Sequence, residues 1–295
     1  MNENTKNQLT LHAVVLLLGL TAILGKLTSI AALPVVVYRT FLASILFSIL
    51  FWARKNKTFD TSSLKPLLLT GMALGLHWVC FFGSARMSTV SLSLVTFSTT
   101  SFFTSILEPL SKKESIRKKE MFLGFLVVLG MFFIFQFESV HFNAIMVGLL
   151  GAILSSVYSV SNVHLTKKNS ALFINLVELS SAFVFAFLAT IAWIWIADIP
   201  FISITPKGSD YTYLLVLVIL CTVLPYLLLI NLLKSMSAFT MNMAINMEPI
   251  YGIVLAWLIF GNAEKMSGGF YIGAGLIIFS LILNGFWARK KPSQL

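Results

Sequence analysis

Charged residues are scarce in this sequence, and acidic residues are scarcer than basic ones. Of the 295 residues, 11% are Asp, Glu, Lys or Arg, 58% are hydrophobic, and only 11 are acidic. An average soluble domain has about 25% charged and about 45–50% apolar residues. The shortage of charge therefore excludes an ordinary soluble domain, and the mean hydropathy of +0.90 indicates a chain embedded in lipid.

Cysteine and histidine are also scarce. The two cysteines, Cys80 and Cys221, lie inside apolar stretches without a CxxC spacing, so neither a disulfide framework nor a zinc site is expected. The four histidines form no HExxH motif, and the chain has no GxSxG motif. We therefore expect no metal site, no cofactor and no catalytic residues, and a membrane-embedded enzyme remains only an alternative.

Long apolar runs fill most of the chain. A helix needs about 20 apolar residues to cross the roughly 30 Å hydrocarbon core of a bilayer. Ten runs approach this length, so the predicted fold class is all-α, a polytopic membrane protein with ten transmembrane helices. The expected spans are Leu11–Ser29, Leu33–Trp52, Leu67–Ala85, Ser91–Leu110, Met121–Phe137, Ala144–Leu165, Leu172–Ala197, Tyr211–Leu233, Ala238–Phe260 and Gly268–Trp287.

The basic residues between the runs fall almost entirely in alternate connections. Sixteen of the 21 Lys and Arg residues lie in one set of connections and four in the other, while Arg39 lies inside a span. Because Lys and Arg in short loops stay on the cytoplasmic side, both termini are predicted to be cytoplasmic. The net charge of +10 is then explained by helix ends that face anionic lipid headgroups, and we expect no nucleic acid partner.

The ten spans divide into two sets of five, which predicts an inverted repeat. The expected units are residues 11–137 and 144–287, between short cytoplasmic tails at 1–10 and 288–295. An offset of 148 residues aligns 77–114 with 225–262 without a gap and places Trp78 on Tyr226 and Thr100 on Glu248. Inverted repeats are typical of secondary transporters, whose substrate site lies near the midplane between the repeats.

Ionisable side chains inside the spans are candidate functional groups, because a charge in hydrocarbon is costly. Three are candidates for proton coupling: Glu248 in the ninth span, Glu178 in the seventh, and His77 in the third. Arg39 either forms a structural ion pair with Glu178 or binds an anionic group of a substrate. Hydroxyl groups of the fourth span are the alternative partners for a substrate carboxylate.

Two prolines are expected to interrupt helices, because proline lacks a backbone N–H. Pro249 follows Glu248 directly, and Pro225 precedes Tyr226. Carbonyl groups released by such breaks can line a cavity.

Aromatic and amide side chains at mid-depth predict a pocket for a small organic solute. Asn242 and Asn246 are four residues apart and share a helix face, as do Tyr158 and Asn162. The alternative is that the asparagines only form hydrogen bonds to neighbouring helices. The predicted substrate-binding residues are Trp78, Tyr158, Asn162, Tyr226, Asn242, Asn246 and Glu248.

Several short segments resemble a known family. The sequences CTVLPY (221–226), LKSMSAFT (233–240) and NMEPIYGIVLA (246–256) are similar to the second repeat of EamA transporters in the drug/metabolite transporter superfamily. The sequences HWVCFFGS (77–84) and TSILEPL (104–110) resemble the first repeat. In this family an acidic residue commonly follows the glycine that closes the ninth span. Here Gly261 is followed by Asn262, with Glu264 two residues further on.

The resemblance implies an inverted 5+5 fold with a central cavity between spans one to four and six to nine. It also implies transport of amino acids, related metabolites or toxic organic compounds, often driven by a proton gradient. We therefore expect a secondary transporter in the cell inner membrane that moves an amino acid or a related polar or zwitterionic solute by alternating access. The alternative is a passive, channel-like permease. The sequence leaves open the substrate, the direction of transport, the coupling ion and the choice between monomer and homodimer.

Overall fold

The computed structural model is helical throughout the residues that it describes, which are 3–54, 59–137, 141–198 and 204–289. No strand occurs in those ranges. Eight helical segments are long and apolar enough to cross a membrane, which confirms the predicted all-α fold of a multi-pass membrane protein. The eight segments are Leu9–Leu27, Ala32–Ala53, Thr61–Met87, Val90–Lys112, Phe142–Leu165, Ala171–Ala197, Asp210–Leu232 and Ala238–Glu264.

Two further helices coincide with the remaining predicted spans but are not among those eight. Helix α7 (Lys118–Phe137) covers the fifth predicted span, and α14 (Gly268–Arg289) covers the tenth. The apolar part of α14 extends only over Gly268–Asn284. The number of ten spans therefore stays a prediction.

Several spans consist of two shorter helices. The break between α1 and α2 falls at Leu20, that between α5 and α6 at Ser98–Thr99, and that between α12 and α13 at Asn246–Met247. A five-residue π-helical segment, η4, joins α10 to α11. The bounds are α1 Glu3–Gly19, α2 Thr21–Leu27, α3 Ala32–Ala53, η1 Thr61–Ser63, α4 Leu64–Met87, α5 Val90–Phe97, α6 Thr100–Lys112, α8 Phe142–Leu165, α9 Ala171–Ala197, α10 Asp210–Val218, η4 Ile219–Val223, α11 Leu224–Leu232, α12 Ala238–Ile245, α13 Glu248–Phe260 and η5 Gly261–Glu264.

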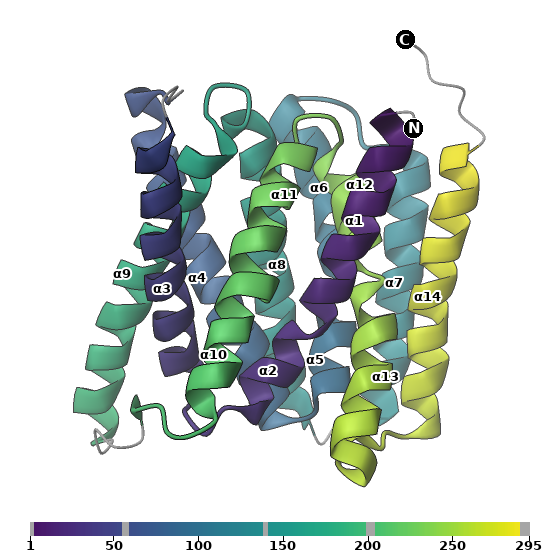
Figure 1. Cartoon of the computed structure of the whole chain (residues 1–295). Coiled ribbons are helices and arrows are strands. Elements are labelled where there is room, and N and C mark those ends of the chain that lie inside the picture. The colour runs from purple at the N-terminus through teal and green to yellow at the C-terminus, as the bar shows by residue number, and fades with distance from the viewer. Residues whose placement is uncertain (1–2, 55–58, 138–140, 199–203, 290–295) are drawn as a thin grey trace.

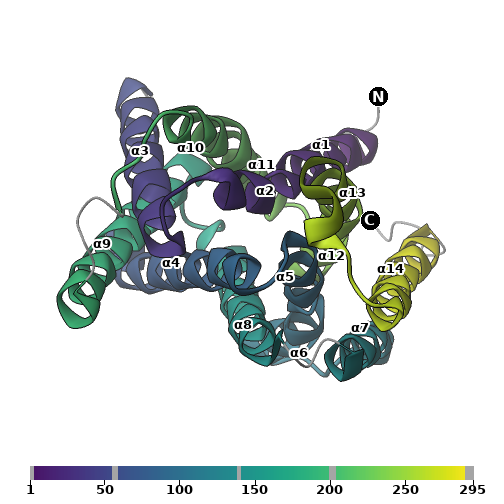
Figure 2. The same ribbon diagram turned by 90° about the horizontal axis from the view of Figure 1, so that it is seen from below.

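The helices run roughly parallel to one axis and form a single bundle. Helix α1 begins and α14 ends at the same face of the bundle (Figure 1). Seen along the axis, α3 packs along α9 at one edge, and α7 packs along α14 at the opposite edge (Figure 2). Each of these pairs joins a helix of the first half to a helix of the second half.

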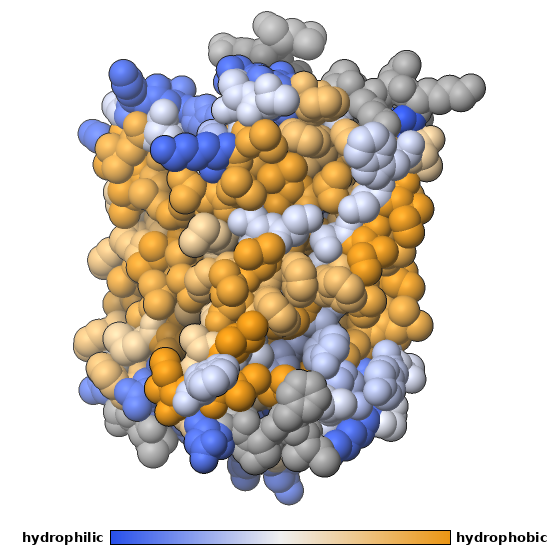
Figure 3. Space-filling model, turned by 90° about the vertical axis from the view of Figure 1, so that its left-hand side faces the viewer, coloured by the Kyte–Doolittle hydropathy of each residue, from blue (hydrophilic) through white to orange (hydrophobic). Residues whose placement is uncertain are grey.

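A belt of hydrophobic side chains covers the bundle between two hydrophilic rims on the face seen in Figure 3. Large apolar side chains are exposed on many helices, and Trp195 and Ile196 near the end of α9 are 84% and 85% exposed. Apolar patches of this extent are unusual on soluble monomers and mark contact with another apolar phase. The belt therefore fits the hydrocarbon of a bilayer.

The two halves interrupt their helices at equivalent positions of the 148-residue register. Helix α5 begins at Val90 and α12 at Ala238, while α6 begins at Thr100 and α13 at Glu248. The breaks have different local causes. In the second half, the N–H-free Pro249 lies in the first turn of α13. In the first half, hydroxyl groups from Ser98 to Ser101 bond to carbonyls of their own helix and compete with its backbone hydrogen bonds.

The ends of these segments repeat as well. The side chains of Thr89 and Ser237, 148 residues apart, each accept a hydrogen bond from the backbone N–H three residues further on. After the segments, Lys113 and Gly261 adopt positive φ angles of 56° and 57°. The register predicted from the sequence is therefore present in the backbone.

The two broken spans are also joined to each other at their N-terminal ends. In each case a buried carboxylate of one span accepts one or two hydrogen bonds from the first backbone N–H groups of the other. Glu264, in η5, accepts hydrogen bonds at 3.0 and 2.9 Å from the backbone N–H groups of Val90 and Ser91 at the start of α5. Glu108, in α6, accepts one at 2.7 Å from the N–H of Phe239 at the start of α12. Helix N-termini favour negative charge, so both contacts stabilise the junction between the halves.

Each capping carboxylate also has a lysine partner. Glu264 pairs with Lys26 at 3.1 Å, and Glu108 pairs with Lys112 at 2.6 Å. The two caps lie at opposite faces of the bundle, because α5 and α12 lie at opposite ends (Figure 1).

Helices α4 and α9 approach each other closely at glycine. A Cβ atom on Gly71 would lie 2.3 Å from the backbone oxygen of Glu178, and one on Gly75 would lie 3.1 Å from Cα of Ala182. Small residues permit such backbone approach between membrane helices. The contact encloses Glu178 against the backbone of α4.

We expect Gly71→Ala to destabilise the protein by about 1–3 kcal/mol, because the added methyl overlaps the backbone of α9. Thermal unfolding of the purified protein in detergent measures the change. The matched control is Gly275→Ala in α14, where a Cβ atom would meet nothing within 4 Å. The control should leave the midpoint unchanged or raise it, and an equal loss in both variants would contradict the packing argument.

Candidate functional site

A small cavity lies inside the bundle between the two halves. It measures about 50 Å³, enough for a few water molecules. Side chains from α1, α2, α3, α4, α5, α8, α11, α12 and α13 line it. A larger solute therefore requires the lining helices to separate.

The cavity brings together most of the residues predicted from the sequence. Of the predicted substrate-binding residues, five line it: Trp78, Tyr158, Tyr226, Asn242 and Glu248. Arg39 and His77 line it too.

Three of the residues predicted for substrate binding or proton coupling do not line the cavity. Asn162 and Glu178 bond to each other, with 2.9 Å between Nδ2 and Oε1. Asn246 donates to the hydroxyl of Ser101 at 2.7 Å and joins α12 to α6. For Asn246 the alternative interpretation, a hydrogen bond to a neighbouring helix, describes the structure.

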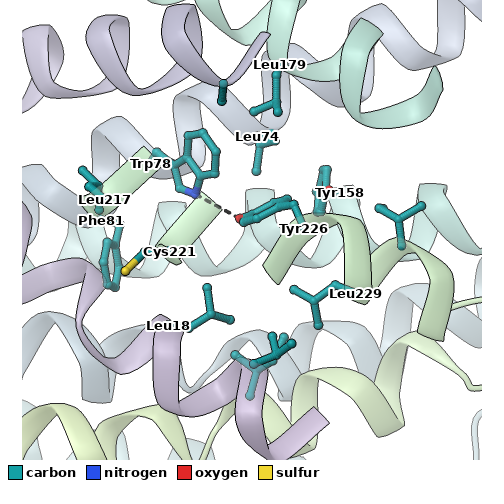
Figure 4. Close-up of a cluster of buried hydrophobic side chains, with 14 of the residues drawn as sticks. Leu18, Leu74, Trp78, Phe81, Tyr158, Leu179, Leu217, Cys221, Tyr226 and Leu229 are labelled. Carbon is teal, nitrogen blue, oxygen red and sulfur yellow. Dashed lines mark hydrogen bonds between the residues drawn. The ribbon is translucent and has the colours of Figure 1, made fainter. Parts of the chain in front are cut away.

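Trp78 and Tyr226 are equivalent in the repeat register and meet each other. Trp78 Nε1 donates a hydrogen bond of 3.1 Å to the Tyr226 hydroxyl, and the rings meet edge to face at 5.2 Å (Figure 4). Tyr158 packs beside Tyr226, with ring centroids 6.1 Å apart. Because the two equivalent positions are in contact, they lie where the two halves face each other.

Arg39 is fully buried and is oriented by three neighbours. Its guanidinium carbon lies 3.7 Å from the centroid of the Trp78 ring, a cation–π contact. Its Nε donates to the Thr222 hydroxyl at 2.7 Å, and its Nη2 donates to the Cys221 carbonyl at 2.9 Å. Its Nη1 has no hydrogen-bond partner. The ion pair with Glu178 that the sequence suggested is not formed.

Pro225 explains why the Cys221 carbonyl is available. In an α-helix this carbonyl accepts a hydrogen bond from the N–H of residue 225, which proline lacks. The chain passes through the π-helical segment immediately before this point, and Arg39 takes the released carbonyl. Pro225 therefore disturbs the helix as predicted, and the disturbance creates a binding site for the guanidinium.

Glu248 is the first residue of α13 and is 3% exposed. It lines the same cavity as Arg39, and the two groups interact electrostatically. The N-terminal position on α13 favours a negative charge. The cavity thus contains one buried cationic and one buried acidic side chain.

His77 and Asn242 have defined hydrogen bonds at the wall of the cavity. His77 Nδ1 lies 2.9 Å from the Gly151 carbonyl, which only accepts, so Nδ1 carries the proton. Asn242 donates to the hydroxyls of Thr104 and Ser159 at 2.9 and 2.7 Å. Asn242 therefore both lines the cavity and links α12 to α6 and α8.

The hydroxyl groups of the fourth predicted span are engaged elsewhere. Thr96, Ser101 and Thr104 each donate to a carbonyl three or four residues earlier in the same span. None of these three lines the cavity. Of these three residues and Arg39, Arg39 alone lines the cavity.

Several lining residues were missed from the sequence. Ser155 and Ser159 lie one turn apart on the face of α8 that carries Tyr158, so helical spacing carried a signal for them. The apolar lining residues carried none, because they do not differ in type from residues that face lipid. They are Leu18, Phe81, Phe97, Leu229, Ile230, Leu233, Met241 and Ile245.

The chain matches one known protein family over nearly its whole length. The sequence model of the EamA-like transporter family matches residues 6–136 and again 142–286. No curated protein matches the sequence. One solved structure, described only as the crystal structure of a protein, matches 97% of this chain and 99% of its own. The TM-score is 0.70 at 14% sequence identity, so this likeness shows the fold alone.

We expect Tyr226→Phe to lower stability by about 1–3 kcal/mol, because the buried Trp78 N–H loses its acceptor. The shift in the thermal unfolding midpoint measures the effect. Tyr271→Phe is the matched control, since Tyr271 is 52% exposed on α14. Equal midpoints for the two variants would show that the Trp78–Tyr226 hydrogen bond does not contribute to the junction.

Proposed function

The chain belongs to the EamA-like transporter family, and on this premise we propose that it is a secondary transporter of a small zwitterionic metabolite. An amino acid or a closely related solute is the substrate class. The solute binds in the central cavity and crosses the membrane by alternating access of the two halves.

The observation that carries this proposal is the pairing of Arg39 and Glu248 in one buried cavity. Arg39 has one nitrogen, Nη1, whose N–H groups have no partner, whereas Nε and Nη2 donate to Thr222 and Cys221. A substrate carboxylate accepts this hydrogen bond, and guanidinium groups suit carboxylates in geometry and charge. Glu248 receives the ammonium group of the same solute. Trp78, Tyr158 and Tyr226 surround its carbon skeleton.

The size of the cavity supports a carrier rather than a channel-like permease. A volume of about 50 Å³ is smaller than an amino acid and offers no wide aqueous path. The lining comes from both halves, so relative movement of the halves enlarges the cavity toward one side at a time. This arrangement is the one that alternating access requires.

The membrane is the cell inner membrane, with the first and last helices entering from the cytoplasm. The support for this orientation is the excess of Lys and Arg in the connections on that side. A proton gradient is the energy source that we propose for net uptake or export.

Counterflow in proteoliposomes tests the proposal. Vesicles loaded with one unlabelled amino acid should take up the labelled solute transiently above equilibrium, and uptake should saturate. A thermal-shift screen of amino acids, amines, carboxylates, nucleobases and sugars identifies the solute, because a ligand that binds only the native state raises its stability. Absence of saturable counterflow for every solute that stabilises the protein would refute the proposal.

We expect Arg39→Lys to lower kcat/KM for the zwitterion about 10–100-fold, since one hydrogen bond to a charged group contributes about 1.5–3 kcal/mol. Glu248→Gln should weaken the binding of solutes that carry an ammonium group more than the binding of carboxylates that lack an amine. Arg117→Lys is the matched control for the arginine, because Arg117 is exposed and forms ion pairs with Glu114 and Glu120, away from the cavity. Equal rates for Arg39→Lys and wild type, with both folded, would remove the carboxylate contact from the proposal.

A further inference from the structure

Glu178 is a buried carboxyl group that the proposed substrate contacts do not use. It lies in the middle of α9 and is 0% exposed. Its Oε1 accepts one hydrogen bond from Asn162 Nδ2 at 2.9 Å, and its Oε2 has no partner. Of the ion pairs found among the described residues, none includes Glu178.

The groups around Glu178 do not offset a negative charge. Gly71 of α4 packs against the backbone of Glu178 and brings no charged group to it. On the elements near α9, the ionisable groups closest to the cavity are Arg39 on α3, His77 on α4, Tyr158 on α8 and Tyr226 on α11. Arg39 bonds to Thr222 and Cys221.

The other ionisable groups near Glu178 form contacts elsewhere, with the exception of Tyr158. His77 donates to the Gly151 carbonyl, and the Tyr226 hydroxyl accepts from Trp78. Tyr38, next to Arg39 on α3, is only partly buried and interacts with Tyr211. An ionised carboxylate without a cation is strongly disfavoured in a low-dielectric interior. Glu178 is therefore neutral in this structure and carries a proton.

The exception is Tyr158, which connects Glu178 with the cavity. Tyr158 lines the cavity, and its hydroxyl has no other hydrogen-bond partner. The phenol and the carboxyl group are close enough to interact electrostatically. Tyr158 Oη and Glu178 Oε2 are thus two buried polar atoms without other partners, and only the first belongs to a residue of the cavity wall.

We propose that Glu178 is the proton site of this transporter and that Tyr158 passes protons between it and the cavity. The inference rests on the proposed function and selects one of the three acids and bases suggested by the sequence. When the cavity opens to one side, a hydronium ion gives a proton to Tyr158 Oη and becomes water, while Tyr158 gives its own proton to Glu178 Oε2. A carboxylate and one proton become a carboxylic acid, and the reverse transfer releases the proton on the other side.

The two other candidates have different roles in this scheme. Glu248 shares the cavity with Arg39, so a cation is present to stabilise its negative charge. It stays available for the substrate ammonium group. His77 keeps its Nδ1 proton in the hydrogen bond to Gly151, which orients the ring at the cavity wall.

Proteoliposomes test the inference with two separate readouts, which are counterflow of the solute and movement of protons. In wild type, solute uptake should acidify or alkalinise a weakly buffered lumen, and an imposed pH gradient should drive accumulation. In Glu178→Gln, which cannot take up a proton, counterflow should persist while the solute-coupled pH change disappears. The rate of counterflow should also lose its dependence on pH. Glu114→Gln, which alters an exposed carboxylate, should behave as wild type.

The outcomes separate the inference from the proposed function. Absence of counterflow in wild type refutes the transporter itself. Counterflow in wild type without proton movement, or proton movement that survives in Glu178→Gln, overturns the proton site and leaves the transporter standing. If Glu178→Gln does not fold, Tyr158→Phe replaces it. Loss of the hydroxyl should slow gradient-driven uptake at least about 10-fold relative to counterflow, and equal slowing of both would overturn the relay.

Discussion

Polar groups in the interior of this bundle must find partners within the protein, because the surrounding hydrocarbon offers none. The consequence is clearest at Arg39. A proline one turn further along α11 removes the N–H that would have bonded to the Cys221 carbonyl, and the guanidinium takes that carbonyl. Trp78 covers the guanidinium and is itself fixed by Tyr226. One missing N–H group thus determines the position of the only cationic side chain at the described cavity wall.

The same constraint explains how the two halves are joined. The spans that contain α5 and α12 both begin with a capped first turn and both break after eight helical residues. The first N–H groups of any helix have no partner within that helix. Carboxylates from the opposite half satisfy those at the start of α5 and α12. The junction between the halves is therefore built from hydrogen bonds to helix ends as well as from apolar packing.

Much of this could be predicted from the sequence, because charged and amide residues stand out in apolar runs. The 148-residue offset placed Trp78 on Tyr226 and the start of α6 on the start of α13. Helical spacing showed that Asn242 shares a face with Asn246, but spacing does not show whether that face turns to a cavity or to another helix. Rotation of a helix depends on all its neighbours, so spacing alone could not show that Asn162 bonds to Glu178 and Asn246 to Ser101. The break at Leu20 could not be predicted in this way, because no proline lies beside it.

The two capping carboxylates depart from the repeat register that relates the two halves. The first turns that they cap are 148 residues apart, yet Glu108 and Glu264 are not, since the register places Ala256 opposite Glu108 and Ile116 opposite Glu264. The carboxylates therefore do not follow the repeat register that relates the helix starts they cap. Each face of the bundle has its own capping carboxylate, from a different stretch of chain. The carboxylate cap at one face can consequently be strengthened or weakened by substitution without altering the cap at the other face.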